Sequence, residues 1–283
     1  MATALHIIAL PGIGEVPAGA DLAAMASEAL QRAGLTLEVR DLLVVAQKIV
    51  SKAEGRIVDL ASVRPSPRAI ELAARTRKDA RLVELVLAES TEVLRARPQV
   101  LIVRHRLGFV MANAGIDRSN VPAGAGGAEV ALLLTRNPDA SAAALRDALQ
   151  ARLGVAPGVI VSDSFGRPWR LGSTNIALGA AGLAALVDHR GETDRNGRTL
   201  EVTQVAAADA LAGAAGLVMG EGAEGTPMVL VRGWGSTAPH LGAAALIRPA
   251  LEDLFGAEDV AAATAPPAAQ GQDLARAGPG GHA

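Results

Sequence analysis

Strand-like and helix-like segments alternate irregularly along this chain of 283 residues, and this irregularity limits the folds it can adopt. Apolar runs predict strands over residues 4–11, 41–50, 55–62 and 99–115. The last of these contains two runs separated by Gly108, which predicts a hairpin. Paired strands mixed with helices favour an α+β fold with mixed sheets over a doubly wound parallel sheet.

Helical spacing of apolar residues predicts the helices. They cover residues 21–34, 68–78, 80–91 and 141–154, the last with Ser141 as a candidate N-cap residue. Residues 159–161 predict a strand running into a polar loop, residues 198–220 a strand followed by a helix, and residues 226–234 a last strand. Residues 176–191 are compatible with either a strand or a closely packed helix. We expect one domain over residues 1–265 and a disordered Ala/Pro/Gly tail over residues 266–283.

Composition excludes several classes of function. The formal net charge of -2 comes without a basic block, which argues against nucleic-acid or membrane-surface partners. Cysteine is absent, so disulfides, thiolate metal sites and a cysteine nucleophile are excluded. The N-terminus lacks the features of a signal peptide, and no stretch is apolar for the roughly 18 residues of a membrane span. We therefore expect a cytoplasmic protein whose partners are small molecules or other protein chains.

Polar residues that a core does not need follow several apolar runs. Four such segments are "LPGIGEV", "VVAQKIVSKAEGR", "NAGIDRSN" and "VSDSFGR", and a fifth, "VMGEGAEGTP", leaves a helix through an acidic glycine-rich turn. Ligand groups gather where strands end, because the strands position a solvent-accessible loop there. We expect these five segments to contribute to one site.

Four acidic residues in these segments are candidate ligands of a hard cation: Asp117, Asp163, Glu221 and Glu224. Oxygen ligands suit Mg²⁺ or Mn²⁺, which keep several waters and need few carboxylates when substrate phosphates also bind. The alternative for each acid alone is a loop carboxylate that caps a turn. The recurrence of four acids at such apolar-to-loop transitions leaves a metal site and turn-capping carboxylates as the two alternatives.

Lysine and asparagine are scarce in this arginine-rich chain, so their positions are informative. Two of the three lysines, Lys48 and Lys52, lie four residues apart in an apolar context, and two of the five asparagines, Asn113 and Asn120, flank Asp117. In a strand, residues four apart face the same side, so both ammonium groups would meet one anionic ligand. Two solvated surface lysines are the alternative.

Common catalytic motifs are missing. No G-x-x-x-x-G-K-[ST] loop occurs, and no G-x-G-x-x-G follows the first strand. No G-x-S-x-G motif occurs, so a Ser-His-Asp mechanism is weakly supported. Arg167 and Arg170 in "GRPWR" are candidates to bind a carboxylate or phosphate, with ordinary surface arginines as the alternative.

The ordered set "LPGIGEV", "AQKIVSKAEGR", "NAGIDRSN", "SDSFGRPWR", "DRNGRTLEVT" and "GEGAEGTPMVLVRG" resembles the coenzyme F420-0:L-glutamate ligase family, the F420 gamma-glutamyl ligases. The resemblance extends from about Leu10 to Gly233. It implies two intertwined subdomains of α+β type, a homodimer, and a nucleotide site near the dimer interface. Its implied activity is a GTP-dependent ligase that joins L-glutamate to F420-0, a deazaflavin with a lactyl-phosphate arm, and that extends an oligoglutamate tail.

The resemblance also implies Mg²⁺ or Mn²⁺ as cofactors, with two ions in the site, and K⁺ as a further candidate. Carried over residue by residue, the nucleotide contacts fall on Leu10, Pro11, Gly12, Ile13, Gln47, Lys48, Lys52 and Asn120, and the metal ligands on Asp117, Asp163, Ser164 and Glu221. Lys52, Asp117 and Asp163 are then the expected catalytic residues.

This chemistry agrees with the missing protein nucleophile. A nucleoside triphosphate converts an unreactive carboxylate into an acyl phosphate, and phosphoryl transfer needs positioning and charge neutralisation above all. Two rival hypotheses remain. One is a related amide ligase or phosphotransferase that acts on another small acid, and the other is a nucleotide-binding protein without catalysis.

Overall fold

The computed structural model describes residues 4–121, 124–249 and 252–253. The described residues up to Ile247 form one compact unit, and those from Arg248 onward belong to a second. The first unit mixes helices with several sheets, which confirms the predicted α+β class. Within the described ranges, every helix is too short or too polar to cross a membrane. The tail predicted at 266–283 lies outside the described residues.

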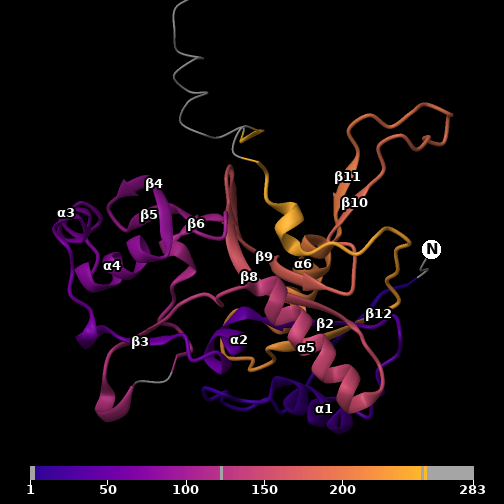
Figure 1. The fold of residues 1–283 in the computed structure, drawn as a ribbon, viewed down its shortest axis with the longest axis horizontal. Coiled ribbons are helices and arrows are strands. Elements are labelled where there is room, and N and C mark those ends of the chain that lie inside the picture. The colour runs from indigo at the N-terminus through magenta and orange to yellow at the C-terminus, as the bar shows by residue number, and fades with distance from the viewer. Residues whose placement is uncertain (1–3, 122–123, 250–251, 254–283) are drawn as a thin grey trace, which may run out of the picture. The chain divides into compact units, whose positions relative to one another are not determined.

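A five-stranded mixed sheet forms the centre of the first unit (Figure 1). Its strands, in spatial order, are β1 (His6–Ala9), β12 (Met228–Arg232), β2 (Leu42–Ala46), β8 (Gly158–Arg167) and β9 (Arg170–Ala181). The pair β2 and β8 is parallel, whereas all other neighbours are antiparallel. The predicted first and last strands are confirmed, and they lie side by side.

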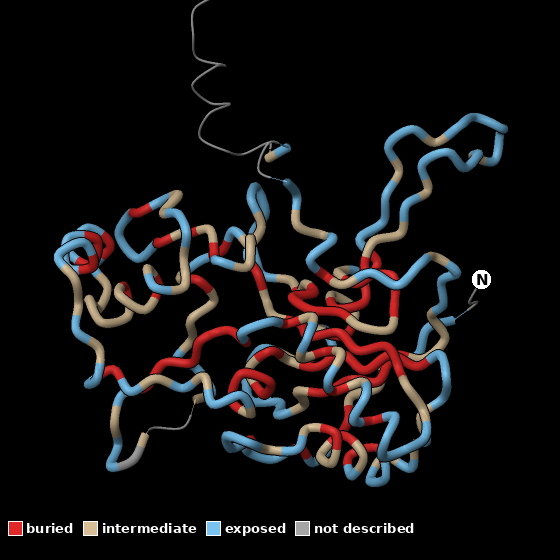
Figure 2. Tube along the Cα trace, in the orientation of Figure 1, coloured by how far each residue is buried: buried red, intermediate tan, exposed pale blue. Residues whose placement is uncertain are grey.

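Helices cover both faces of this sheet. Alternate residues of a strand point to opposite faces, so Leu43 and Val45 pack in one cluster while Leu42 and Val44 pack in another. The first cluster contains α1 (Leu22–Arg32), α2 (Gln47–Ala53) and α5 (Pro138–Leu153), and the second contains α6 (Ala207–Met219). Figure 2 shows the resulting band of buried residues along the sheet.

A smaller lobe is formed by residues 67–112. It contains α3 (Pro67–Thr76), α4 (Ala80–Ala88), and an antiparallel sheet of β4 (Ser90–Arg97), β5 (Val100–His105) and β6 (Val110–Ala112). The predicted hairpin is confirmed, and Gly108 adopts the left-handed conformation, with φ of 93°, that its turn requires. The helix expected to reach residue 91 ends at Ala88 instead, because the next residues pair with β5.

Short elements complete the unit. They are β3 (Ile57–Asp59) paired with β7 (Val130–Leu132), β10 (Leu186–Asp188) paired with β11 (Gln204–Ala206), and the 3-10 turns η1 (Leu60–Ser62), η2 (Asn113–Gly115), η3 (Ala125–Gly127) and η4 (Ala243–Leu246). The β10–β11 hairpin projects from the body, and its distal part is exposed (Figures 1 and 2).

Three predictions about local structure were wrong. The strand expected over residues 41–50 ends at Ala46, and α2 begins at Gln47. The polar loop expected after residue 161 is instead the β8–β9 hairpin, because residues 162–166 pair with 173–177. The N-cap of α5 is Asn137, whose side chain accepts from the backbone N–H of Ala140, and not Ser141, which lies in the first turn after Pro138.

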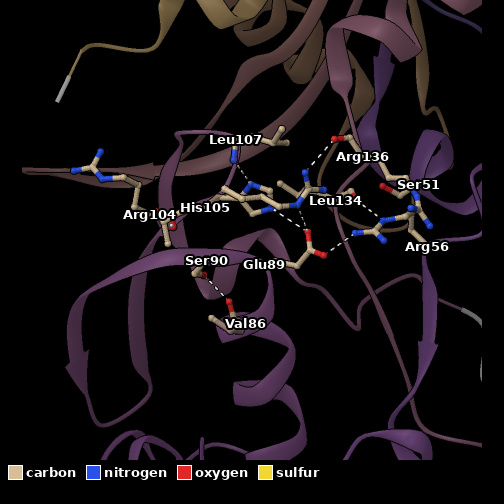
Figure 3. Close-up of polar contacts among 12 residues, drawn as sticks. Ser51, Arg56, Val86, Glu89, Ser90, Arg104, His105, Leu107, Leu134 and Arg136 are labelled. Atoms are coloured by element: carbon tan, nitrogen blue, oxygen red, sulfur yellow. Dashed lines mark hydrogen bonds and ion pairs between the residues drawn. The ribbon is translucent and has the colours of Figure 1, made fainter. Parts of the chain in front are cut away.

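A partly buried ionic cluster joins the smaller lobe to the segments next to β3 and β7 (Figure 3). Glu89, at the end of α4, accepts hydrogen bonds from Arg56 at 2.9 Å and from Arg106 at 3.0 Å. His105 Nε2 lies 3.4 Å from the same carboxylate, and Arg56 also donates to the Leu134 carbonyl at 2.9 Å. The contact with His105 and then the two guanidinium groups lower the pKa of Glu89 to about 2, against the effect of burial.

Candidate functional site

The five polar segments meet at a cavity of about 660 Å³, which we call cavity A. Its lining comes from residues 13–15, from Ala46, Lys48, Ile49 and Lys52, and from residues 120–121, 162–164, 175 and 219–227. Three of these segments follow the ends of β1, β2 and α6, and a fourth lies on β8. All five segments therefore line one cavity.

Helix α2 presents both lysines to cavity A. Lys48 and Lys52 are one helical turn apart, so they share a face of α2, although by helical and not by strand geometry. Lys52 is only 7% exposed at its side chain, and its Nζ lies 2.6 Å from Oε1 of Glu15. This ion pair ties α2 to the loop after β1.

Lys48 contacts the segment that contains Asp117, the aspartate flanked by two asparagines. Its Nζ lies 2.6 Å from Asp117 Oδ2 and donates to Ser119 Oγ at 3.0 Å, while Ser119 donates to the same carboxylate oxygen at 2.8 Å. Burial raises the pKa of Asp117, but the hydrogen bonds from Lys48 and Ser119 outweigh burial, so this pKa lies below its ordinary value. Asp117 is therefore held as a carboxylate.

The backbone around Asp117 explains where the asparagines lie. Asn113, Ala114 and Gly115 have φ values of 52°, 53° and 67°, and Asn120 has φ of 54°. Asparagine adopts this left-handed conformation more readily than other residues with a Cβ atom. Both flanking asparagines therefore fit their backbone, and Asn120 also lines cavity A and donates to the Gly222 carbonyl at 3.4 Å.

Three further oxygen-bearing side chains line cavity A: Asp163 and Ser164 on β8, and Glu221 after α6. Burial, and to a smaller extent the charges of Asp117 and Glu221, raise the pKa of Asp163 to about 7. Lys48 acts in the opposite direction. The cluster thus holds more negative charge than its one nearby lysine neutralises.

The chemistry of this cluster fits a hard cation. Within residues 4–121, 124–249 and 252–253, no three acidic or histidine side chains are close enough together to hold an ion as they stand. All four candidate ligands nevertheless carry oxygen, the atom that Mg²⁺ and Mn²⁺ prefer. Ser162 Oγ, in the same lining, is buried without a hydrogen-bond partner among the described residues, as expected where a bound group supplies one.

Some predicted nucleotide contacts do not line cavity A. Leu10 is fully buried in the core and its backbone N–H donates to the Met228 carbonyl, and Pro11 and Gly12 are not in the cavity lining although their neighbour Ile13 is. Gln47, the first residue of α2, is buried, and its Oε1 accepts from the Ser51 hydroxyl. Of the candidate acids, Glu224 lines cavity A but accepts from the Gly222 backbone N–H at 2.8 Å.

A second cavity of about 610 Å³, which we call cavity B, adjoins the cluster on the side of the smaller lobe. Three of its lining residues, Lys48, Asp163 and Ser164, also line cavity A. Asp117, Arg167 and Arg170 line cavity B as well. The carboxylate cluster therefore lies where the two cavities meet.

Three residues of this arrangement were not predicted as site residues. Glu15 pairs with Lys52, Ser119 links Lys48 to Asp117, and Ser162 is the unpartnered hydroxyl. All three lie within the quoted segments or next to a predicted ligand, which was the one available signal. The contacts of Glu15 and Ser119 with the two lysines join residues distant in sequence, so this pairing was not visible there.

Comparisons with known proteins identify the family. The family model described as F420-0:Gamma-glutamyl ligase matches residues 12–233. The chain is 45% identical over 253 residues to the coenzyme F420:L-glutamate ligase of Methanothermobacter thermautotrophicus, covering 89% of this chain and 98% of that protein. It is 48% identical over 234 residues to the enzyme of the same name from Halobacterium salinarum, covering 81% and 87%. It is 44% identical over 229 residues to that of Methanopyrus kandleri, again covering 81% and 87%. The chain therefore belongs to the F420-0:gamma-glutamyl ligase family.

Proposed function

We propose that this protein is a ligase that joins L-glutamate to coenzyme F420-0 through an amide bond, with GTP as the phosphoryl donor and Mg²⁺ or Mn²⁺ in the site. Family membership supports the two substrates. The observation that carries the proposal is cavity A itself, whose lining brings the two lysines together with Asp163, Ser164 and Glu221. Ammonium groups beside clustered oxygen ligands suit a polyphosphate with its metal ions.

The proposed reaction has two steps. A carboxylate oxygen of F420-0 attacks the γ-phosphorus of GTP, and the bond from that phosphorus to the oxygen bridging to the β-phosphate breaks, so that GDP leaves with the electron pair. The amino group of glutamate then attacks the acyl carbon. The bond from this carbon to the phosphate oxygen breaks, inorganic phosphate leaves, and the nitrogen loses a proton to give the amide.

The side chains of cavity A, together with Asp117 of cavity B, supply positioning and charge. Lys48 and Lys52 bind phosphate oxygens, and Lys52 neutralises charge that develops as the γ-phosphoryl group leaves. Asn120 contributes a polar contact to the nucleotide. Asp117, Asp163, Ser164 and Glu221 would hold the divalent cations, which when bound neutralise phosphate charge and polarise the γ-phosphoryl group.

No protein nucleophile is needed in this scheme. Both nucleophiles, a carboxylate and an amine, belong to substrates, so the protein needs neither a cysteine nor a serine triad. The absence of cysteine from the sequence agrees with this.

The proposed enzyme is a homodimer, as the family resemblance implies. The projecting β10–β11 hairpin supports this, because it carries two neighbouring exposed valines, Val202 at 84% and Val205 at 43%, which a partner subunit would cover (Figure 1). Sedimentation analysis of the wild-type protein and of Val202→Glu tests the proposal. We expect a dimer whose dissociation constant rises in the variant, and a wild-type monomer would contradict it.

The test of the function is an assay with GTP, Mn²⁺, L-glutamate and F420-0, followed by mass spectrometry of both products. We expect one GDP for each glutamate added. Asp117→Asn keeps the size of the side chain and should reduce turnover by about 100-fold or more while the thermal unfolding transition remains. Turnover of another carboxylate in place of F420-0, or near-normal activity of the variant, would refute the corresponding part of the proposal.

A further inference from the structure

We propose that cavity B binds the deazaflavin acceptor, with Arg167 and Arg170 holding the phosphate of its lactyl-phosphate arm. The inference rests on the proposed function and extends it, because it assigns the second substrate to a cavity and to named residues. Four features of the described residues carry it: the shared wall, the apolar lining, the two arginines and the size of the cavity.

The shared wall places cavity B correctly for the acceptor. Lys48, Asp163 and Ser164 line both cavities, so a group in cavity B that reaches this wall meets the phosphates bound in cavity A. Phosphoryl transfer requires the attacking oxygen and the leaving oxygen on opposite sides of the γ-phosphorus. Two cavities that meet at the carboxylate cluster provide these two sides.

The lining of cavity B suits a planar aromatic ring. It includes six apolar side chains from the smaller lobe and the β8–β9 hairpin: Ile102, Val110, Met111, Ile116, Phe165 and Pro168. Phe165 packs edge-to-face against Phe109, with ring centroids 6.2 Å apart, and this contact holds the Phe165 ring in the wall of cavity B. Ligand pockets are mainly apolar, with a few polar groups that fix orientation.

The two arginines supply the complementary charge. Arg167 ends β8 and Arg170 begins β9, and both line cavity B. Among the residues that the structure describes, neither guanidinium forms an ion pair, and Arg167 makes a single weak contact, to the Leu171 carbonyl at 3.4 Å. A guanidinium binds a phosphate in bidentate fashion, so both groups are available for an anionic arm.

Glutamate fits cavity B less well than the deazaflavin does. A cavity of about 610 Å³ lies within the 300–1,000 Å³ typical of drug-sized ligands. Free glutamate carries three charges and little apolar surface, so burying it against six apolar side chains would cost desolvation without compensating contacts. The deazaflavin has both a ring for the apolar wall and an anionic arm for the arginines.

Direct binding of F420-0 tests the inference. The double variant Arg167→Gln with Arg170→Gln should raise the Kd of F420-0, measured by its fluorescence polarisation, at least tenfold. The Kd of GTP with Mn²⁺, measured by calorimetry, should stay within twofold. A charge-matched control is Arg68→Gln with Arg75→Gln, two exposed arginines of α3 outside both cavities, and it should change neither constant.

Two further measurements separate the ring from the arm. The deazaflavin riboside without the phosphate arm should bind the Arg167 and Arg170 double variant as well as it binds the wild type. Val110→Glu places a carboxylate in the wall of cavity B and should weaken both ligands, whereas Val100→Glu, an equally exposed valine of the same small sheet outside cavity B, should weaken neither.

The outcomes distinguish this inference from the proposed function. If wild-type protein binds F420-0 and the arginine double variant binds it equally well, cavity B is not the acceptor site, although the ligase function stands. If the double variant loses GTP and keeps F420-0, the arginines serve the nucleotide and the inference is overturned. If the wild-type protein binds no F420-0, the proposed function fails, and the inference fails with it.

Discussion

Lys48 Nζ lies 2.6 Å from Asp117 Oδ2, so an ammonium group occupies one side of the carboxylate that we propose as a metal ligand. The pair joins α2 to the strained turn after β6, two parts of the chain that are distant in sequence. The negative charges of Asp117 and Glu221 raise the pKa of the nearby Asp163. Lys48 is the charged side chain that acts against them.

Replacement of Lys48 should affect metal and nucleotide in opposite directions. Lys48→Met leaves Asp117 without its cationic partner, so Mn²⁺ in the absence of GTP should bind up to about fivefold more tightly. This factor corresponds to the free energy that a partly exposed ion pair contributes. The same variant should bind GTP more weakly, because a phosphate contact is lost. Electron paramagnetic resonance titration of Mn²⁺ measures the first effect, with Lys48→Arg as the charge-preserving control. Weaker Mn²⁺ binding by Lys48→Met would contradict this account of the pair.

Glu15 should compete with phosphate for Lys52. The Glu15 side chain is 61% exposed while that of Lys52 is nearly buried, so the lysine is fixed and the glutamate is free to move away. Glu15→Gln should therefore lower the Kd of GTP by up to about fivefold, as expected for a pair exposed on one side. Lys52→Gln should instead reduce kcat by about 100-fold, comparable to removal of one stabilising donor in other active sites.

Isothermal titration calorimetry with GTP provides the measurement for Glu15→Gln. Glu28→Gln, which removes an exposed carboxylate on α1, is the control for net charge. Should Glu15→Gln bind GTP more weakly than the wild type, Glu15 would belong to the nucleotide site itself.

Glycine substitutions separate the conformational role of each asparagine from its chemical role. Glycine adopts positive φ freely, so Asn113→Gly should keep both stability and activity, whereas Asn113→Ala should lower the free energy of unfolding by about 1 kcal/mol. Asn120→Gly keeps the backbone but loses the side chain that faces cavity A. We expect its KM for GTP to rise with kcat less affected. Wild-type kinetics for Asn120→Gly would show that only the backbone conformation matters there.

The Glu89 cluster should make stability depend on acid pH. The pKa of Glu89 is lowered from 4.5 to about 2 in the folded protein, so the unfolded chain takes up the proton first as the pH falls. The stabilisation is complete above pH 4.5 and is lost as the pH falls towards 2; a shift of this size corresponds to about 3 kcal/mol. Urea unfolding between pH 2 and 6 measures this effect.

Glu89→Gln should be less stable than the wild type at pH 6, and the difference should shrink steadily towards pH 2. Glu92→Gln, which removes an exposed carboxylate on the neighbouring strand β4, is the matched control and should change stability little. A difference between Glu89→Gln and the wild type that stays constant over this pH range would show that the cluster stabilises by packing alone.

The errors in the predicted fold have local physical reasons. The run from Leu42 to Val50 is apolar apart from Gln47 and Lys48, and it is too short for its periodicity to mark the change from β2 to α2 at Gln47. Strand β4 carries arginine and glutamate at exposed positions, because it lies at the edge of its sheet, and so lacks an apolar signal. The N-cap of α5 was predictable in principle, since Asn137 precedes a proline at the first helical position.

The site was predictable as a set of segments but not as a set of pairs. Charged residues at the ends of apolar runs indicated where cavity A would form, since scarce lysines and asparagines stand out against this composition. The ion pairs of Lys48 with Asp117 and of Lys52 with Glu15 depend on tertiary packing, and nothing in the sequence joins them. Cavity B likewise depends on how the smaller lobe meets the β8–β9 hairpin.

Transfer of ¹⁸O from the acceptor tests the central claim most directly. F420-0 labelled with ¹⁸O in its carboxylate is incubated with the protein, GTP, Mn²⁺ and L-glutamate, and the products are analysed by mass spectrometry. The account predicts a glutamylated product that keeps one labelled oxygen, and inorganic phosphate that carries the other, because the carboxylate oxygen attacks the γ-phosphorus. Glutamylated product with unlabelled phosphate would contradict the acyl-phosphate route, and absence of that product would contradict the proposed function.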